Sequence, residues 1–298
     1  MVKKISSITV VLNVFKRASV LEKQIDSVCK QTIPPNEIIL WKNFSGKQIK
    51  LSKKILNRVI LMECSENLGV WVRFSAALNS KSEFVCILDD DTIPGRKWFE
   101  NCINSSRHLD GIFGTRGIRF YSKNRYDPHD FYGWQNPVDQ ITEVDIIGHA
   151  WFFKREYLSY FWKELPELNQ STRVGEDIHF SYTVQKYGNL KTYVPPHPLD
   201  DLDFWGSLPK YGNEIGTDIH SISNKVNSHA LFNAALKNYT NKGFSLYYKK
   251  NKNKDTGITI GPGIKSLSFI QHLSRRYPWI KMNGKKILKM LSKIKIHL

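Results

Sequence analysis

Residues 84–94 read FVCILDDDTIP, and this stretch decides the fold that we expect. Its first five residues are apolar, as in a strand buried on both faces of a parallel sheet. Asp89, Asp90 and Asp91 follow where that strand would end. Because ligands of open α/β sheets bind outside the carboxyl ends of the strands, the three aspartates stand where a ligand would lie.

Three adjacent carboxylates repel one another unless a cation neutralises them. Hard oxygen ligands of this kind suit Mg²⁺ or Mn²⁺, which typically bridge to the phosphates of a substrate. Residues 89–91 therefore predict a divalent-metal site for a phosphorylated ligand. A solvated acidic turn is the alternative.

Strand and helix signals alternate along the first 90 residues. Apolar runs at 8–14, 37–41 and 59–62 indicate strands, and the patterns at 18–31 and 69–79 indicate helices. This alternation predicts βαβ units around a Rossmann-like, mostly parallel sheet flanked by helices, with the strand ends on one edge. Polar residues would gather at that edge: Asn13, Lys42, Asn67 and the three aspartates.

Length and composition fit a globular protein. The 298 residues are 41% hydrophobic and 12% aromatic, which argues against a disordered chain. No apolar stretch approaches the roughly 20 residues that span a bilayer. Basic residues precede the apolar run 8–15, but this run is short, contains Asn13 and lacks a following cleavage site, so a first strand fits better than a signal peptide.

The four cysteines (29, 64, 86 and 102) are widely spaced and form no C-x-x-C pair. This spacing indicates no disulfide framework, so we expect a reducing, cytoplasmic setting.

The net charge of +17 is concentrated at the C-terminus. Residues 265–298 hold nine Lys and Arg and no Asp or Glu. Within this tail, residues 285–298 place four apolar residues on one side of a helix among lysines: Ile287, Leu288, Leu291 and Ile294. A basic amphipathic helix of this kind can lie on an anionic membrane, here the inner membrane face. A solvated helix packed on the domain is the alternative.

A second acidic motif lies in GEDIHFSYTVQKYG, residues 175–188. The pattern predicts a helix that opens with Glu176 and Asp177 and ends at Gly188. A carboxylate there could act as a general base on a hydroxyl group. Acidic residues in a first helical turn also stabilise the helix dipole, which is the competing interpretation.

Four segments in order resemble the family-2 type glycosyltransferases, nucleotide-sugar enzymes with the GT-A fold. They cover about residues 8–200: ITVVLNVFKRASVLEKQIDSVCKQTIPPNEIILWKN, ENLGVWVRFSAAL, LDDDTIP and GEDIHFSYTVQKYG. They look like the family's opening strand–helix–strand, its N-x-G segment with a following arginine, its D-x-D metal motif and its E-D catalytic helix. The ending W-K-N and the DDDT sequence also resemble the exostosin-like N-acetylhexosaminyltransferases, which share this fold and are retaining.

The resemblance implies roles for the acidic residues. Asp91 would be the principal ligand of Mn²⁺ or Mg²⁺, and Asp89 would point to the ribose or the water shell of the metal. Asp177 would be the catalytic base, with Glu176 orienting the acceptor. His197, in the P-P-H-P turn, would complete the metal shell, unless it is an ordinary surface residue.

The donor side is implied in the same way. The nucleotide-sugar would contact Arg73, unless this is only an exposed helical arginine. Lys42 and Asn43 stand where the family often has an acidic residue that contacts the base. The other expected donor contacts are Asn13, Asn43, Asn67, Asp89 and Asp90.

The acceptor pocket is expected around GHAWFFKREYL, residues 148–158. Gly148 would permit close approach, His149 would lie beside it, and Trp151 would stack on a sugar ring. An ordinary buried strand is the alternative for Trp151.

Taken together, the sequence and the resemblance imply a metal-dependent, UDP-sugar-using and inverting glycosyltransferase of surface polysaccharide or lipid-linked saccharide synthesis. It would carry a GT-A domain at 1–205, an irregular region completing it at 206–264 and a basic helical tail at 265–298. A retaining transferase and a nucleotidyltransferase are the enzymatic alternatives. A nucleic-acid-binding protein is the non-enzymatic one, although no recognised nucleic-acid motif is present.

Overall fold

The computed structural model describes residues 6–46, 48–166, 174–215 and 228–250. The basic tail expected at 265–298 lies outside these residues. The predicted domain boundaries therefore stay a prediction.

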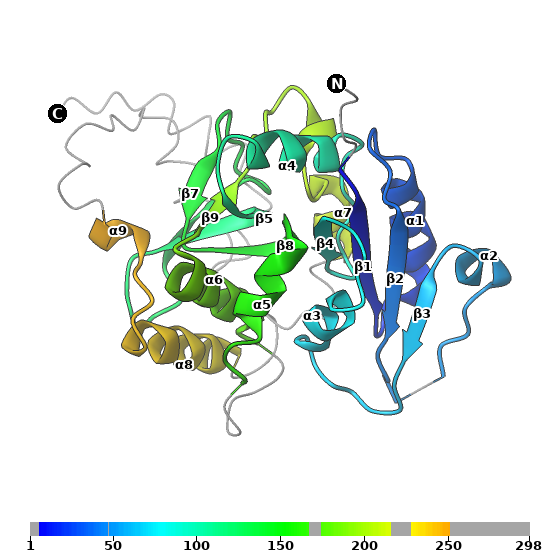
Figure 1. Cartoon of the computed structure of the whole chain (residues 1–298), viewed down its shortest axis with the longest axis horizontal. Helices are drawn as coiled ribbons and strands as arrows, with labels where there is room; N and C mark the ends of the chain where they lie inside the picture. The colour runs from blue at the N-terminus through cyan, green and yellow to red at the C-terminus, as the bar shows by residue number, and fades with distance from the viewer. Residues whose placement is uncertain (1–5, 47, 167–173, 216–227, 251–298) are drawn as a thin grey trace, which may run out of the picture. The chain divides into compact units, whose positions relative to one another are not determined.

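Within the described residues, nine strands form one sheet in the order β3-β2-β1-β4-β8-β5-β9-β7, with β6 paired to β5 (Figure 1). The strands are β1 (Ile8–Val14), β2 (Glu37–Lys42), β3 (Ile60–Glu63), β4 (Phe84–Leu88), β5 (Gly111–Phe120), β6 (His129–Tyr132), β7 (Thr142–Val144), β8 (Ile146–Lys154) and β9 (Lys191–Val194).

Helices lie on both faces of this sheet. They are α1 (Ala18–Cys29), α2 (Lys53–Leu56), α3 (Val72–Ala77), α4 (Trp98–Ser106), α5 (Leu158–Phe161), α6 (Glu176–Gly188), α7 (Pro209–Ile215), α8 (Ser228–Asn241) and α9 (Tyr247–Lys250), with short 3₁₀ turns η1 (Arg155–Tyr157) and η2 (Leu202–Phe204).

The half of the sheet formed by β3, β2, β1 and β4 is wholly parallel, and we call it the parallel half. Its strands and its helices α1 and α3 match the predicted runs to within a few residues. The chain builds β2 and β3 on one side of β1 and then returns to place β4 on the other side. This reversal creates a topological switch point beside β1 and β4, where α/β proteins of this type bind ligands.

The other half, which we call the mixed half, contains β8, β5, β9, β7 and β6. β8 inserts antiparallel between β4 and β5, and β9 runs parallel to β5. The register of β5 and β8 shifts at a bulge, so that Thr115 lies opposite both Gly148 and His149. Such bulges re-aim side chains beside active sites.

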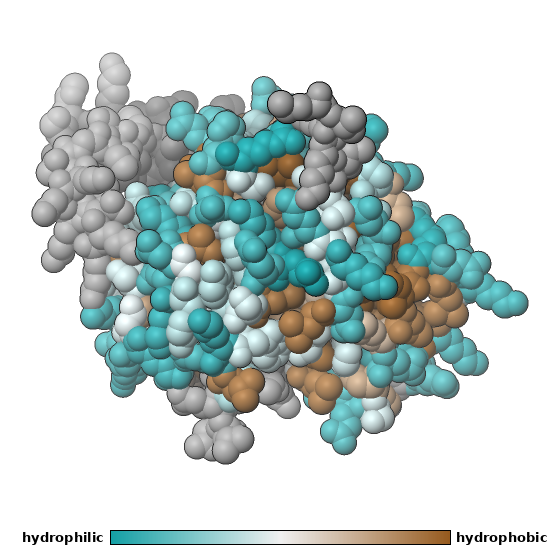
Figure 2. All heavy atoms as spheres, viewed as in Figure 1, coloured by the Kyte–Doolittle hydropathy of each residue, from teal (hydrophilic) through white to brown (hydrophobic). Residues whose placement is uncertain are grey.

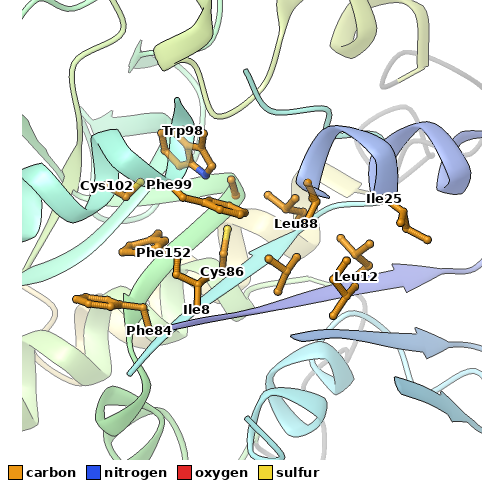
Figure 3. Close-up of a cluster of buried hydrophobic side chains, with 14 of the residues drawn as sticks. Ile8, Leu12, Ile25, Phe84, Cys86, Leu88, Trp98, Phe99, Cys102 and Phe152 are labelled. Carbon is orange, nitrogen blue, oxygen red and sulfur yellow. The ribbon is translucent and has the colours of Figure 1, made fainter. Parts of the chain in front are cut away.

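Three hydrophobic clusters pack against the sheet in the described part of the chain, and two of them lie on its opposite faces. One lies under α1 and α4, and Figure 3 shows Leu12 and Ile25 meeting on one side of it while Phe99 and Phe152 fill the other. The second core lies under α3, α5 and α6, with Phe74 and Phe180 among its buried members. Because each buried side chain of this size contributes about 1.5–3 kcal/mol, the cores hold the strand ends in a fixed frame.

The edge strand β3 is the least covered part of the parallel half. Ile60 is 48% exposed and Leu61 is 37% exposed. Figure 2 shows hydrophobic residues gathered on the right of this face, where β3 lies in Figure 1. The strand has only four residues, which limits pairing with other chains at this edge.

Candidate active site

The three aspartates form a turn directly after β4, held by backbone contacts from two sides. The Asp89 amide donates to the carbonyl of His149 at 2.9 Å, and the Thr92 hydroxyl donates to the same oxygen at 3.0 Å. From α1, the buried Gln24 amide donates to the carbonyls of Asp89 and Thr92 at 2.7 and 2.8 Å. We call residues 89–91 the acidic turn. Its position is therefore fixed by β8 and α1 as well as by β4.

Two arginines neutralise part of the acidic turn. Arg17, which precedes α1, forms ion pairs with Asp90 at 2.6 Å and Asp91 at 3.4 Å. Arg73, in α3, forms an ion pair with Asp89. Burial raises the pKa of Asp90 in spite of the attraction of Arg17, which lowers it. The turn remains rich in carboxylate oxygens, with the Asp89 and Asp91 side chains 25% and 19% exposed.

The E-D motif forms the first turn of α6, as predicted from the sequence. Gly175 precedes the helix with a φ of 91°, a left-handed conformation that glycine adopts without steric cost. Glu176 is buried and forms an ion pair with Arg73. Arg73 therefore lies between the acidic turn and the start of α6, which brings the two predicted acidic motifs into one site.

Asp177 is half-buried beside Glu176. Its Oδ1 accepts a hydrogen bond from the backbone amide of Ile178 at 2.7 Å. Burial, together with the neighbouring charge of Glu176, raises the pKa of Asp177 to about 7. A carboxylate with a pKa near neutrality is suited to take up a proton at neutral pH.

The start of α6 is anchored by aromatic and imidazole side chains. The Trp71 indole donates to the carbonyl of Val174 at 3.3 Å. Both ring nitrogens of the buried His179 are hydrogen-bonded, Nδ1 to the Tyr239 hydroxyl at 3.0 Å and Nε2 to the carbonyl of Phe161 at 2.7 Å. Burial lowers the pKa of His179 to about 4, so the ring is neutral at physiological pH. These contacts fix α6 against α3, α5 and α8.

The asparagines expected on the donor side come from three strand ends: Asn13 is near the end of β1, Asn43 directly follows β2, and Asn67 lies in the loop after β3. Asn43 and Asn67 come together, with the Asn43 amide donating to Asn67 Oδ1 at 2.9 Å. Asn43 is 6% exposed, and its Oδ1 also accepts from the Leu68 amide at 3.1 Å. The pair therefore ties the loop after β3 to the end of β2. Asn13 has a buried Oδ1 for which the described residues offer no hydrogen bond.

The structure rules out one of the two interpretations that the sequence allowed for Arg73. It is 5% exposed, so the exposed helical arginine is wrong. Both terminal nitrogens of its guanidinium contact carboxylates of the protein. Its predicted contact with the nucleotide stays a prediction.

The residues expected to line the acceptor pocket separate into two groups. A side chain added at Gly148 would meet nothing within 4 Å, so this glycine borders open space. His149 is half-buried with a φ of 60°, and its ring lies 4.9 Å from that of Trp134. Burial, with the charges of Arg116 and Arg73, lowers the pKa of His149 to about 3.

Trp151, by contrast, is a core residue. It is 2% exposed, and its ring packs against Phe74 at 5.9 Å and under the Arg73 guanidinium at 4.6 Å. The ring has no open face on which a sugar could stack. It supports Arg73 instead.

His197 is a buried residue, so the alternative of an ordinary surface residue is wrong, and its predicted role as a metal ligand stays a prediction. The ring is fully buried, and Nδ1 donates to the carbonyl of Pro195 at 2.7 Å. Nε2 is therefore the acceptor, and it already receives the Thr115 hydroxyl at 3.0 Å and the Gly206 amide at 3.3 Å. Burial lowers the pKa of His197 to about 4. Its contacts are those of a structural histidine that joins β5 to the segment after β9.

The chemistry of the acidic turn fits a magnesium or manganese ion shared with a substrate. Such ions are usually held by one or two carboxylates together with substrate phosphates and waters. The described part of the chain contains no group of three or more metal-ligating side chains at one place. Asp91 and Asp89, the more exposed members of the turn, are the residues that would hold the ion.

Arg17 and Gln24 are site residues that our reading of the sequence missed. Both come from the segment after β1, Arg17 from the loop and Gln24 from α1. This segment begins at the same edge of the sheet as the acidic turn. Because β1 and β4 are adjacent and parallel, a cation just after the β1 strand could have been paired with acids just after β4. Gln24 gave no comparable signal, because a glutamine on a helix is usually a surface residue.

Comparison with known proteins identifies a family. The sequence model described as Glycosyl transferase family 2 matches residues 9–162, more than half of the chain. This match confirms the predicted GT-A-type α/β fold that the sheet displays. None of the curated proteins matches the chain significantly in sequence.

Among solved structures, the chain is similar to one titled "Crystal structure of S. aureus TarS 1-349". The identity is 16% and the TM-score 0.47, over 85% of this chain and 76% of that chain. A likeness this distant carries no inference about activity. The resemblance to the exostosin-like enzymes is not addressed by these matches and stays a prediction.

One further property concerns membranes. No helix in the described ranges is both long enough and apolar enough to cross a bilayer.

Proposed function

The chain belongs to glycosyl transferase family 2, and on that premise we propose that it transfers a sugar from a nucleotide-diphosphate sugar to a hydroxyl group of a glycan. The observation that carries the proposal is the meeting of the acidic turn and the first turn of α6 at one site, with Arg73 between them. One motif is suited to hold a diphosphate and the other to activate a hydroxyl group.

The donor side of the proposed site is the edge of the parallel half. Asn13, Asn43 and Asn67 would face the nucleoside, and Asp89 and Asp90 would face the ribose and the diphosphate. Asn13 supports this assignment, because its buried Oδ1 has no hydrogen-bond donor among the described residues. A uracil base, which offers one N–H donor, would provide a partner, so UDP-sugars are the first donors to test.

A bound Mg²⁺ or Mn²⁺ would neutralise the negative charge that builds on the departing nucleoside diphosphate. Asp91 and Asp89 would hold it by their carboxylates. Arg17 would keep Asp90 and Asp91 in place, since it already pairs with both.

Asp177 is the proposed general base. Its carboxylate would take the proton of the acceptor hydroxyl as that oxygen bonds to the anomeric carbon, while the bond from this carbon to the diphosphate breaks. This single displacement inverts the anomeric carbon. Glu176 would orient the acceptor through its fixed position beside Asp177, and Gly148 and His149 would border the space that the acceptor enters.

Two enzymatic alternatives give different products. A retaining transferase would preserve the configuration of the anomeric carbon, and a nucleotidyltransferase would release pyrophosphate in place of a nucleoside diphosphate. Synthesis of a surface polysaccharide or a lipid-linked saccharide, with the tail at 265–298 on an anionic membrane, is the setting that we propose for the transferase.

The first test is a thermal-shift screen of nucleotide sugars with and without Mn²⁺. A bound ligand raises the melting temperature by mass action, by an amount equivalent to about 2.7 kcal/mol at a concentration 100 times its Kd. We expect one class of nucleotide sugar to stabilise the protein more when Mn²⁺ is present. We expect Asp91→Ala to remove this extra stabilisation.

Asp110→Ala is the matched control, because Asp110 forms its ion pair with Lys154 and not with the acidic turn. This variant should retain the metal-dependent shift. If no nucleotide sugar stabilises the wild-type protein, the proposed donor class is incorrect. If Asp91→Ala and Asp110→Ala respond alike, the metal assignment is incorrect.

A further inference from the structure

We propose that Arg73 is a positioning residue that holds the start of α6 at a fixed distance from the acidic turn. It would thereby fix the position of the base, Asp177, relative to the donor. This inference rests on the proposed function and deepens it, because it gives Arg73 the role of aligning the proposed base with the proposed donor site. The role differs from direct binding of the nucleotide, which the sequence alone suggested.

The contacts of Arg73 span the site. One terminal nitrogen, Nη1, pairs with Asp89 at the end of β4, and the other, Nη2, pairs with Glu176 at the start of α6. These two carboxylates are 87 residues apart in the sequence. A planar guanidinium with donors on both sides can hold two carboxylates in one geometry, which a lysine cannot do.

The surroundings of Arg73 prevent it from moving freely. It is 5% exposed, and its guanidinium lies 4.6 Å from the centroid of the buried Trp151 ring. Phe74, the next residue in α3, is itself packed against Phe161 and Phe180. The Trp151 ring and the helix α3 that carries Arg73 are both packed in the core. The guanidinium therefore cannot move without disturbing that core.

The charge of Arg73 also acts on Asp177. Asp177 adjoins Glu176, and the positive charge of Arg73 lowers the pKa of Asp177 while the negative charge of Glu176 raises it. The two neighbours therefore oppose each other at the proposed base. Removing either one should shift the pH dependence of transfer, in opposite directions.

The experiment compares Arg73→Met, Arg73→Lys and Glu176→Gln with the wild-type protein, using the donor found by the screen. We expect Arg73→Met to lower kcat about 100-fold, the cost expected of a misplaced catalytic group. The acid limb of its kcat–pH profile should move upward by about one pH unit. The affinity of Arg73→Met for the nucleotide should stay within about threefold of the wild type, since the guanidinium of Arg73 pairs with carboxylates of the protein and not with the nucleotide.

The other two variants separate charge from geometry. Arg73→Lys keeps the charge but cannot reach both carboxylates, so its kcat should fall while the acid limb stays at the wild-type pH. Glu176→Gln should move the acid limb to lower pH, which a merely destabilised protein would not do. If a melting curve shows that Arg73→Met does not fold, Glu176→Gln still tests the inference.

Arg58→Met is the matched control, because Arg58 pairs with Asp26 of α1 away from both acidic motifs. It should lose stability but keep the acid limb and kcat of the wild type. An unshifted acid limb in both Arg73→Met and Glu176→Gln would overturn the inference, and a tenfold or larger loss of nucleotide affinity in Arg73→Met would instead assign Arg73 to the donor. If Asp177→Asn is inactive but Arg73→Met and Glu176→Gln both keep the wild-type acid limb, only the positioning role is rejected. If Asp177→Asn transfers sugar at the wild-type rate, the assignment of Asp177 as the base is rejected, and failure of the wild-type protein to transfer sugar from any donor would reject the proposed function.

Discussion

The parallel half and the mixed half of the sheet place their candidate site residues by different means. In the parallel half, Asn13 is the last but one residue of β1, and Asn43 and the acidic turn directly follow β2 and β4. In the mixed half, His149 and Gly148 lie at a bulge, and the neighbouring Arg116 has a φ of 52°. Every non-glycine residue with positive φ in the described part of the chain belongs to segments at or after β5.

This difference has a physical origin. The ends of regular strands at a switch point can place carboxylates that bind a diphosphate through a shared divalent cation. An acceptor requires side chains aimed at a particular shape, and backbone strain or a bulge is one way to aim them. The α6 helix joins the two halves, because its first turn contacts Arg73 of the parallel half while its later residues pack on β5 and β8.

The largest effect that we expect concerns two glycines of the mixed half. A side chain added at Gly114 would collide with the carbonyl oxygen of Ala150 and with Ile147, in the paired strands β5 and β8. Gly114→Ala should therefore lower the free energy of unfolding by about 3 kcal/mol or more, in the range of overpacked core sites. Urea unfolding followed by circular dichroism measures this difference.

Gly148→Ala is the control for this comparison, because the same added methyl group meets open space. It should change stability by less than about 0.5 kcal/mol. Gly148→Leu should also fold normally but raise the KM for the acceptor, if the open space receives it. Equal stability of Gly114→Ala and Gly148→Ala would show that the bulge does not depend on the close approach of β5 to β8.

A smaller effect concerns Asp177 and pH. The pKa of Asp177 is raised to about 7 in the folded protein, whereas an unfolded aspartate titrates near 3.9. The stabilising contribution of its bound proton is therefore fully present below the unfolded pKa and is lost as the pH rises through about 7. Asp177→Asn should be more stable than the wild type at pH 8, by roughly 1–3 kcal/mol.

The dependence on pH is the decisive part of this prediction. The gap between variant and wild type should be near zero at pH 4, grow up to about pH 7 and stay level above it. Melting curves across this range, without nucleotide or metal, provide the measurement. A gap of the same size at every pH would mean that the folded environment does not raise the pKa of Asp177.

The parallel half could be predicted from sequence because its signals are local. Each buried strand is a short apolar run, and the carboxylates of the acidic turn directly follow one of them. The E-D helix was also predicted in place, since its acidic start and its terminal Gly188 are adjacent to its apolar pattern. Such features depend on neighbours in the chain, which a sequence displays.

The remainder depends on contacts between distant segments. The partners of Arg73, the burial of Trp151 and the hydrogen bonds of His197 come from strand pairings that the sequence does not show. An apolar run such as that of β8 likewise gives no sign of whether it pairs parallel or antiparallel. The aromatic pattern around Trp151 was therefore compatible with both a sugar platform and a core residue, and the structure places it in the core.

The most direct test of the two-part site is to measure nucleotide binding and sugar transfer separately in Asp177→Asn. Calorimetric titration with the nucleotide should give an affinity within about threefold of the wild type, because we propose that the donor binds at the acidic turn. Transfer under single-turnover conditions should be slower by about 10²–10⁴-fold, the usual loss on removing a general base. Transfer at the wild-type rate would contradict the assignment of Asp177 as the base, and with it the proposed division of the site into a donor half and an acceptor-activating half.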